Sequence, residues 1–473
     1  MHSEHPKTCK LVRSVHTKIC QLVHSKIFNS LIHCTLSYFL LSLQIIRIKT
    51  MDKRTLETIL ADQVEELSLK RNQQFCQRKE EDLIDLSSPQ AQVVIGVRRS
   101  GKSTLCYNAL IRSGVKFAYV NFDDERLIHL TADDLNDVLE VLYKINGDFN
   151  YLFIDEIQNI PEWHLFVNRL LRRQLHIIIT GSNAKLLSGE LATHLTGRHH
   201  VIHLYPFSFD EYVALKKIDD KSLSTKAIAE RRKAFDDYLH TGGFPELFFI
   251  KNTKDYINEL FNNILQRDIE QRFKILYSSA FEQMAHHLLN IAPTIVIDKT
   301  LQELFDFKSP HTSKNYLNYL KQAYLVISLR KYSPKSSLRV VGEKIYPIDV
   351  SFMNSRENAF AGENLGWRLE TVVFLHLLKK YKPEGKDIYY LRDRSGECDF
   401  IVCSGRKAEL AIQVSYDISS PKTKKREIAG LILAAKKTGC NNLLLLTDHD
   451  FEDIVVGDYN IAIRPVYDYL LRN

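Results

Sequence analysis

The sequence predicts an α/β protein whose first folded region is a doubly wound parallel sheet. Short apolar stretches around Val93, Phe117, Leu152, Ile177 and Val201 alternate with helical patterns, as in successive strand–helix units. The first stretch runs directly into a glycine-containing loop, and the third ends in two acidic residues. At 473 residues, the chain has room for about two to four domains.

Composition indicates a globular protein of a reducing compartment. Hydrophobic residues make up 45% of the chain, and the eight cysteines show no CxxC spacing, which argues against a disulfide scaffold or a zinc finger. The net charge is +7, but seven Lys/Arg and one acidic residue place +6 of it in residues 1–50. The rest is close to neutral, so composition does not predict a basic surface over the whole body. We expect a cytoplasmic location.

The first fifty residues form a segment of their own. The stretch 27–46 carries no charge unless His33 is protonated and is long enough to span a bilayer, but polar residues interrupt it and basic residues lie on both sides. Met51 then begins an amphipathic helical pattern. We interpret residues 1–50 as a non-native or disordered extension, with a membrane anchor as the weaker alternative, and residues 51–88 as an N-terminal helical segment.

The stretch "VVIGVRRSGKSTL" carries the strongest signal. It places Gly96-x4-Gly101-Lys102-Ser103 between a strand and a helix, which is the context of a phosphate-binding P-loop. Glycines allow consecutive backbone N–H groups to face phosphate oxygens, and the helix N-terminus adds partial positive charge. The pattern predicts that Lys102 contacts the β- and γ-phosphates of ATP and that the Ser103 hydroxyl binds Mg²⁺. The expected ATP-binding residues are Gly96, Val97, Arg98, Arg99, Ser100, Gly101, Lys102, Ser103 and Thr104. Arg98 and Arg99 either face a neighbouring subunit or domain, or are solvated.

Four further residues complete the expected site, within a core at 89–215. The strand "YLFIDE" ends in Asp155, expected to hold Mg²⁺, and Glu156, expected to polarise the attacking water. Asn183 follows the next strand, where it would contact the γ-phosphate or the water, or serve only as a turn residue. Arg198 precedes another strand and would act as an arginine finger in cis or trans, or lie solvated on a loop. The expected catalytic residues are Lys102, Glu156, Asn183 and Arg198.

The middle of the chain predicts a helical lid at 216–277 and a winged helix at 278–350. Three helical patterns precede two strands joined by a basic turn. In a DNA reader the third helix would enter the major groove, and the hairpin would approach phosphates. The side chains concerned are Lys314, Asn315, Asn318 and Lys321 on the helix, and Arg330, Lys331, Lys335 and Arg339 on or near the hairpin. A protein-interaction module is the equal alternative.

The region 351–473 contains a pattern typical of metal-dependent nucleases. Asp399 lies in the strand-like run "CDFIVC", Gln413 lies in the next strand "ELAIQVSYD", and Glu370 lies on a helical pattern. Cleavage also requires a cation near these ligands, but the expected lysine position is Ser415. The nearest lysine, Lys407, is eight residues away, and we expect no other lysine to replace it on that face. The sequence therefore favours a catalytically inactive fold retained for binding over active cleavage, with a structural role as a further alternative.

Several stretches together carry a family resemblance. They are "VVIGVRRSGKSTL", "YVNFDDERL", "LFIDEIQNIPEWHLFVNRL", "ITGSNAKLLSGELATHLTGR", "PFSFDEY", "GGFPE", "LQRDIEQRFKI", "GWRLETVVFLHLLKK" and "ECDFIVCSGRKAELAIQVSY". From about Met51 to its end, the chain resembles the prokaryotic AAA-type P-loop ATPases that carry a C-terminal domain of uncharacterised function with a restriction-endonuclease-like fold. The ATPase motifs are highly specific in combination, and the C-terminal motifs moderately so.

The resemblance implies a parallel-stranded ATPase core closed by a small helical region near "GGFPE". We expect an ATPase that depends on Mg²⁺ and couples its nucleotide state to the winged-helix and nuclease-like domains, for DNA-related or regulatory work. The alternatives are a DNA nuclease driven or gated by ATP, and a nucleotide-gated protein-interaction switch with little turnover. The expected partners are ATP, DNA, and either a protein or a second copy of the chain; a membrane is not expected.

Overall fold

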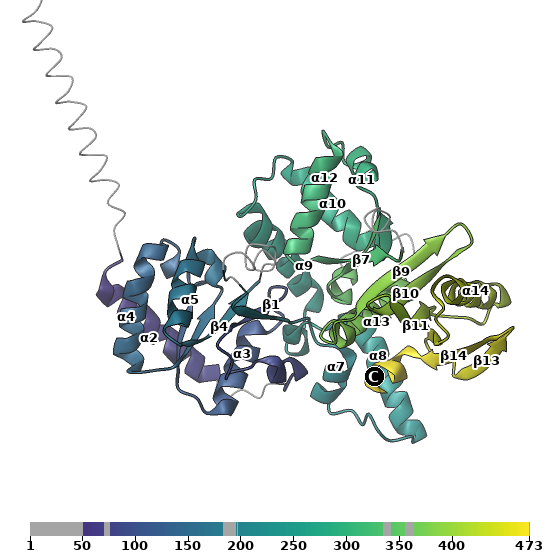
Figure 1. Cartoon of the computed structure of the whole chain (residues 1–473), viewed down its shortest axis with the longest axis horizontal. Helices are drawn as coiled ribbons and strands as arrows, with labels where there is room; N and C mark the ends of the chain where they lie inside the picture. Colours follow the sequence, from purple (N-terminus) through teal and green to yellow (C-terminus); the bar gives the residue numbers. More distant parts are fainter. Residues whose placement is uncertain are drawn as a thin grey trace, which may run out of the picture.

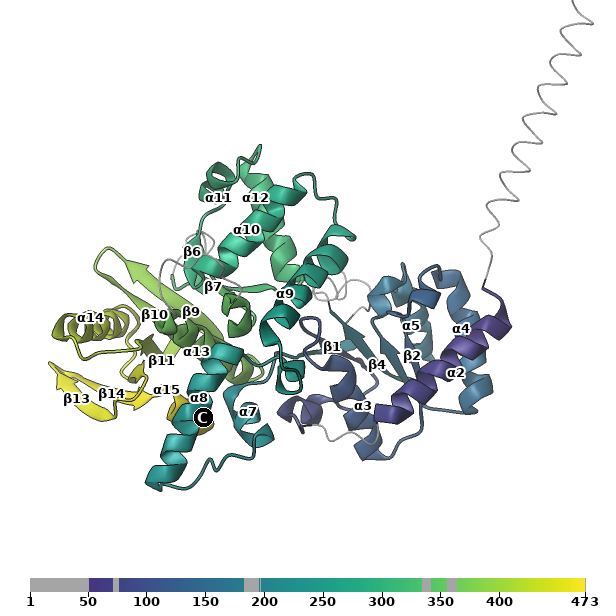
Figure 2. The ribbon, with the colours of Figure 1, turned by 180° about the vertical axis from the view of Figure 1, so that it is seen from behind.

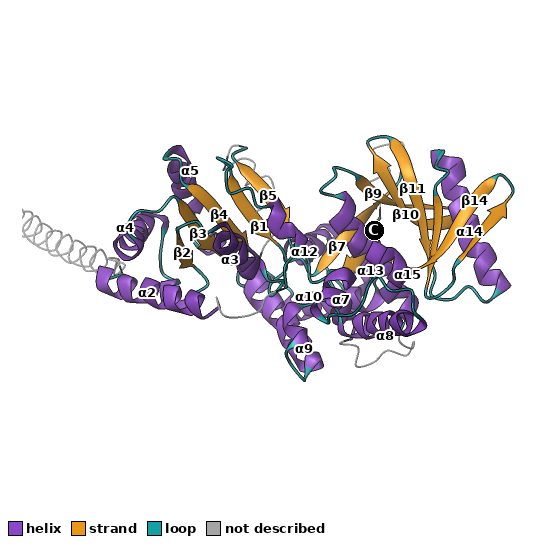
Figure 3. Cartoon of the chain, turned by 90° about the horizontal axis from the view of Figure 1, so that it is seen from below, coloured by secondary structure: helices purple, strands orange, loops and turns teal. Residues whose placement is uncertain are grey.

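The computed structural model describes residues 51–70, 76–182, 195, 197–333, 342–354 and 364–472 (Figure 1). Two β-sheets lie toward opposite ends of the molecule, with helices between them (Figures 1 and 3). Our expectations for residues 1–50, Asn183, Lys335 and Arg339 concern positions outside the described residues. Within the described ranges, no helix is both long enough and apolar enough to cross a membrane.

The first sheet has five parallel strands in the order β2-β3-β4-β1-β5. Its strands are β1 (Ala91–Ile95), β2 (Phe117–Asn121), β3 (Tyr151–Asp155), β4 (His176–Gly181) and β5 (His199–His203). The accompanying helices are α2 (Lys53–Lys70), α3 (Lys102–Ser113), α4 (Leu135–Asn146) and α5 (Trp163–Arg172). All five predicted strands are present, and the predicted doubly wound sheet is confirmed.

Helices cover both faces of this sheet. Because side chains alternate along a strand, Val93 faces one layer of helices and its neighbour Val94 faces the other. Val93 belongs to the core that includes Leu56 of α2, whereas Val94 belongs to the core that includes Leu110 of α3. The helix α2 runs beside α4 (Figure 2). Burial on both faces explains why these strands are continuous apolar runs rather than alternating ones.

A helical region follows the first sheet. It comprises α7 (Phe209–Leu215), α8 (Thr225–Thr241), α9 (Thr253–Asn263) and a π-helix at Ile264–Glu270. Three more helices and three strands come next, in the order α10 (Ser278–Ile291), β6 (Thr294–Val296), α11 (Asp298–Leu304), α12 (Pro310–Gln322), β7 (Val326–Lys331) and β8 (Glu343–Pro347). Ser309 caps α12 by accepting a hydrogen bond from the Thr312 amide, and Pro310 opens the helix, as its position in the sequence predicts.

The second sheet has nine strands in the order β13-β14-β12-β11-β10-β9-β7-β8-β6. The elements after residue 363 are α13 (Leu365–Tyr381), β9 (Asp387–Asp393), β10 (Gly396–Ser404), β11 (Lys407–Val414), α14 (Pro421–Thr438), β12 (Leu443–Thr447), β13 (Glu452–Val456), β14 (Tyr459–Pro465) and α15 (Val466–Arg472). Strand β7 pairs in parallel with β9, through Arg330 with Tyr389 and Lys331 with Tyr390. The sequence predicts a domain boundary at 350; here strands from both sides of it share one sheet.

The second sheet is also covered on both faces. Phe374 of α13 stacks on Phe400 of β10, in the same core as Ile412 of β11. On the other face, Leu431 of α14 shares a core with Ala411. Gly430 permits this approach of α14, because a Cβ atom there would lie 2.2 Å from the carbonyl oxygen of Glu397.

We predict that Gly430→Ala destabilises the fold. Overpacking typically costs about 1–3 kcal/mol, which outweighs the gain of about 1 kcal/mol in helix propensity. The matched control is Gly366→Ala in α13, where the nearest atom to a new Cβ, that of Tyr416, lies 4.0 Å away. The urea midpoint should fall for Gly430→Ala and stay level or rise for Gly366→Ala. Equal midpoints for the two variants would contradict the packing described for α14.

Candidate functional site

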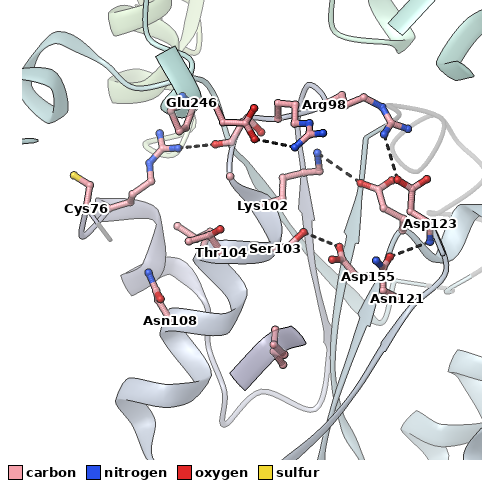
Figure 4. Close-up of a pocket in the computed structure, with 18 of the residues that line it drawn as sticks. Cys76, Arg98, Lys102, Ser103, Thr104, Asn108, Asn121, Asp123, Asp155 and Glu246 are labelled. Carbon is pink, nitrogen blue, oxygen red and sulfur yellow. Dashed lines mark hydrogen bonds and ion pairs between the residues drawn. The ribbon is translucent and has the colours of Figure 1, made fainter. Parts of the chain in front are cut away.

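The loop between β1 and α3 lines a pocket of about 580 Å³ (Figure 4). Its two glycines meet different requirements. A Cβ atom at Gly96 would lie 2.0 Å from the carbonyl oxygen of Leu204, so the backbone approach excludes a side chain there. Gly101 caps α3 with a φ of 94°, in the left-handed region that favours glycine. The loop therefore has the backbone freedom that phosphate binding requires.

Lys102 is buried in this pocket and lies close to an acidic residue. Its Nζ atom donates a hydrogen bond to the carbonyl oxygen of Val97 at 3.1 Å and lies 3.8 Å from Oε1 of Glu156. The ammonium therefore stands between the loop and the end of β3. This is the position from which a lysine can contact a phosphate chain held by the loop.

Ser103 and Asp155 lie side by side below the loop (Figure 4). The Ser103 hydroxyl donates to Oδ1 of Asp155 at 3.0 Å, and the Tyr119 hydroxyl donates to Oδ2 at 3.3 Å. The Thr180 hydroxyl also donates to Asp155. Burial, with the nearby charge of Glu156, raises the pKa of Asp155. Hydroxyl and carboxylate oxygens are ligands that Mg²⁺ prefers, so this pair fits the cation.

Glu156 is held by Ser182, which follows β4, and by Gln158 of the turn after β3. Its Oε2 atom accepts hydrogen bonds from the Ser182 amide at 3.1 Å and the Ser182 hydroxyl at 3.0 Å, and also from Gln158. Burial alone would raise the pKa of Glu156, but Lys102 and other donors outweigh burial and lower it. Glu156 is therefore an oriented, ionised carboxylate at the pocket.

The two arginines of the loop form ion pairs within the chain. Arg98 donates to Asp268 at 3.0 and 3.3 Å and to Asp123 at 3.2 Å, while Arg99 donates to Glu246 at 2.8 Å. The sequence left open whether these arginines face another domain or are solvated; Arg98 contacts the buried Asp268 of the π-helix. Sequence reasoning did not single out Asp268, and π-helical turns are often found at functional sites.

Arg198 does not lie at this pocket. Its carbonyl accepts a hydrogen bond from Ala91, at the amino end of β1, whereas the loop follows Ile95 at the carboxyl end. The two ends are about 13 Å apart along the strand. The side chain is exposed and is absent from the described lining of the pocket. A role for Arg198 in cis is incompatible with this arrangement, and a role in trans stays a prediction.

Arg78 connects the pocket to the second half of the chain, a role that no motif indicated. Its buried guanidinium donates to the carbonyl oxygen of Ser100 in the loop at 3.1 Å and to Glu211 at 2.7 and 3.1 Å. Glu211 also accepts from Lys379 of α13 at 2.7 Å, and Lys379 lies 3.3 Å from Glu80. Burial disfavours the charge of Glu211, but Lys379 and Arg78 outweigh it and lower its pKa. The four residues form a buried charge network, in which Arg78, Glu80 and Glu211 are buried and Lys379 at its edge is half-buried.

The C-terminal candidates are partly brought together. Glu370 and Asp399 both form ion pairs with Lys344 of β8. Gln413 accepts a hydrogen bond from the Asp399 amide at 3.3 Å. Ser415 instead donates to the Asp417 carbonyl at 3.2 Å. Burial, with the charge of Glu370, raises the pKa of Asp399 to about 7.

A lysine does lie beside Glu370 and Asp399. The expectation that no other lysine replaces the one missing at Ser415 is therefore wrong. Lys344 Nζ is 2.7 Å from Glu370, 2.8 Å from Glu397 and 3.3 Å from Asp399. Lys344 comes from β8, on the other side of the domain boundary predicted at 350. The sequence around Ser415 therefore could not indicate it. The only local signal was a lysine within the otherwise apolar stretch "KIYPI".

Comparisons with known proteins agree with this architecture. A family model described as an AAA domain matches residues 88–213, and one described as a domain of unknown function matches residues 232–362. A protein of Methanocaldococcus jannaschii, described as uncharacterized, is 33% identical over 450 residues, which cover 91% of this chain and 99% of that protein. A Haemophilus influenzae protein with the same description is 31% identical over 425 residues, covering 85% and 97%.

The first region is thus an ATP-binding AAA-type P-loop domain. The chain belongs to the same family as these two uncharacterized proteins, and it carries the AAA domain at 88–213 followed by the domain of unknown function at 232–362. Among solved structures, the Walker-type ATPase of Pyrococcus abyssi is similar with a TM-score of 0.40 and 16% identity, covering 59% of this chain and 95% of that one. The Aeropyrum pernix Orc1 protein in complex with DNA has a TM-score of 0.27 and 12% identity, covering 56% and 86%.

We predict that Lys102→Ala weakens ATP binding by about 10- to 100-fold. A hydrogen bond to a charged group is worth about 1.5–3 kcal/mol, and the variant removes the lysine that would contact the phosphates. Calorimetric titration with ATP measures the affinity. Lys116→Ala, at an exposed lysine outside the pocket, is the control and should bind ATP normally. Unchanged affinity in Lys102→Ala would contradict the assignment of this pocket to ATP.

Proposed function

We propose that this protein is a Mg²⁺-dependent ATPase whose nucleotide state is coupled to its C-terminal region. The observation that carries the proposal is the grouping of Lys102, the Ser103–Asp155 pair and Glu156 around one pocket. Lys102 would bind the β- and γ-phosphates, and Ser103 with Asp155 would hold Mg²⁺. When bound, Mg²⁺ would neutralise phosphate charge.

Glu156 would orient the attacking water. Its carboxylate is ionised and fixed by Ser182, so it can accept a hydrogen bond from water without first moving a proton elsewhere. Asn183 follows Ser182 directly in the chain, and we keep it as the proposed contact to the γ-phosphate or the water. Arg98 pairs with Asp123 and with Asp268 of the π-helix, so contact between Arg98 and the phosphates would require at least one of these ion pairs to break.

The buried charge network supports coupling between the two halves. Arg78 holds the backbone of Ser100 in the P-loop, and the same Glu211 that binds Arg78 also binds Lys379 of α13. Movement of the P-loop on nucleotide binding would therefore be transmitted through these contacts to α13. Networks of contacts that switch between two discrete arrangements commonly transmit the nucleotide state of a site to attached domains.

We further propose that residues 278–350 form a winged helix within a unit that includes a nuclease-like domain. The order of three helices and a hairpin supports this, and Lys314 of α12 is exposed. Lys321, however, forms an ion pair with Glu343 of β8. This ion pair engages one of the four α12 side chains that were expected to face DNA. DNA and a protein are therefore both candidate partners of this unit.

We predict that Glu156→Gln lowers steady-state ATP turnover by about 100- to 10,000-fold while ATP binding persists. General-base assistance accounts for rate factors of this size, and the amide keeps the shape of the side chain. The matched control is Glu162→Gln, because Glu162 is exposed, precedes α5 and does not line the nucleotide pocket. Phosphate release and calorimetry measure the two effects. Retained turnover would contradict the role of Glu156, and a single burst without turnover in the wild type would favour the switch alternative.

We expect DNA to raise the ATPase rate if the C-terminal unit works on DNA. The measurement is ATP turnover of the full chain with no DNA, single-stranded DNA and duplex DNA at one salt concentration, because phosphate contacts are strongly salt-dependent. Stimulation by either form would support a nucleic-acid partner. Identical rates in all three conditions would contradict a DNA-coupled ATPase and favour a protein partner.

A further inference from the structure

Asp268 is a buried carboxylate that contacts the P-loop from outside the first sheet. It lies on the π-helix that continues α9, and its side chain is 1% exposed. Among the described residues, Arg98 donates to it at 3.0 and 3.3 Å, Arg272 lies 3.3 Å from it, and the Ser182 hydroxyl lies 3.4 Å from it. A buried carboxylate carries a cost unless it is paired, so Asp268 depends on these two guanidinium groups.

Arg98 lines the nucleotide pocket together with Lys102 and Glu156, and two carboxylates engage it there. Its Nε and Nη2 atoms donate to Asp268, and its Nη1 atom donates to Asp123 at 3.2 Å (Figure 4). The edge formed by Nε and Nη2 is a fork of two donors, the geometry with which arginine binds a carboxylate or a phosphate. Asp268 and a phosphate therefore compete for the same edge of Arg98.

The contacts of Ser182 locate this competition within the pocket. The Ser182 hydroxyl lies 3.0 Å from Glu156 and 3.4 Å from Asp268, so it bridges the two carboxylates. Glu156 is the residue proposed to orient the attacking water, and that water approaches the γ-phosphate of a bound nucleotide. Arg98, which pairs with Asp268, therefore stands on the γ-phosphate side of the pocket.

The two partners of this ion pair belong to different parts of the molecule. Arg98 is part of the P-loop, whereas Ile269, next to Asp268, is buried in a core that includes residues of α10 and α12. Phe273, just after the π-helix, stacks on Tyr319 of α12, with the ring centroids 4.1 Å apart. Asp268 is thus anchored in the helical region, and its ion pair with Arg98 connects that region to the P-loop.

We propose that Asp268 is a positioning residue that holds Arg98 in the empty site and releases it to the γ-phosphate of ATP, where Arg98 acts as a catalytic residue in cis. The inference rests on the proposed function, because it requires ATP in this pocket. A phosphate takes Arg98 from a carboxylate because it carries the greater negative charge. Asp268 keeps Arg272 as its partner after the release. Arg98 thereby takes the role that Arg198 cannot take in cis.

The role of Arg98 in hydrolysis is to stabilise charge. The water oxygen bonds to the γ-phosphorus, and the bond from that phosphorus to the β–γ bridging oxygen breaks, leaving its electron pair on ADP. One proton of the water stays on the phosphate, and the other passes to solvent. Negative charge builds up on the transferred group and on the leaving oxygen during this step, and the Arg98 guanidinium stabilises it.

The test uses the full chain with Mg²⁺ and measures, by calorimetry, the affinities for ADP and for the non-hydrolysable β,γ-methylene analogue of ATP. Asp268→Asn keeps the shape of the side chain but removes its charge, so it should bind the analogue about 10-fold more tightly than the wild type. Its affinity for ADP should stay level, because ADP has no γ-phosphate to accept Arg98. A purely structural role of Asp268 would change both affinities alike.

Substitutions of Arg98 test the other partner of the ion pair. Arg98→Met should bind the analogue about 10-fold more weakly, bind ADP normally and hydrolyse ATP about 1,000-fold more slowly than the wild type. Arg98→Lys keeps the charge but not the fork and should recover part of the turnover. The double variant Asp268→Asn/Arg98→Met should bind the analogue as Arg98→Met does, because no guanidinium is left to release.

Glu270→Gln is the matched control. Glu270 lies on the same π-helix, accepts a hydrogen bond from Ser278 and, among the described contacts, has none with Arg98. The control should leave both affinities and the turnover unchanged. If Asp268→Asn does not fold by circular dichroism, Arg98→Met, in which Asp268 keeps Arg272, decides the question through the same comparison of the analogue with ADP.

Three results would each overturn the inference and leave the proposed function standing. They are an unchanged or weaker affinity of a folded Asp268→Asn variant for the analogue, an equal gain in affinity for the analogue and for ADP, and wild-type turnover by Arg98→Met. Failure of the proposed function gives a different result, because the wild type itself would then bind neither nucleotide, which would overturn both.

Discussion

The buried ion pairs between Arg78, Glu211 and Lys379 are the interaction on which the arrangement of the two halves depends. Arg78 precedes the first sheet, Glu211 lies on α7, and Lys379 lies on α13 of the second unit. Removing one partner of a buried pair typically costs about 3–5 kcal/mol, because the other charge is left uncompensated. Arg78 also binds the Ser100 carbonyl, so this contact ties the backbone of the P-loop to the C-terminal unit.

Helix α13 extends this connection to the ion pairs of Lys344. Lys379 and Glu370 are nine residues apart on it, which is about 14 Å along the axis. Glu370 contacts both Lys344 and Tyr346 of β8. A single helix therefore carries one residue of the charge network and one residue that pairs with Lys344.

The parts of the protein that the sequence predicted well are those encoded by short contiguous stretches. The strand, loop and helix around Lys102 are adjacent in the chain, and the parallel sheet brings the end of β3, with Asp155 and Glu156, to the same edge. The sequence left Arg198 open between an arginine finger and a solvated loop residue, and its exposed side chain lies before the amino end of β5, at the edge opposite the P-loop.

The contacts that were missed join residues far apart in sequence. Arg78 and Glu211 are separated by 133 positions, and Lys344 and Asp399 by 55. No local pattern marks either pair, because a charged residue in an apolar stretch does not reveal its partner. Lys344 lies beside its carboxylates because β7 pairs with β9. This pairing joins the regions before and after the domain boundary predicted at 350.

The central claim is that ATP binding at the P-loop is transmitted to α13. Amide hydrogen exchange of the Glu156→Gln variant, with and without ATP and Mg²⁺, tests it most directly, because the nucleotide is not consumed. The account predicts altered exchange in the P-loop, around residues 78–83 and in α13. Altered exchange confined to the first sheet and its loops, with α13 unchanged, would contradict it.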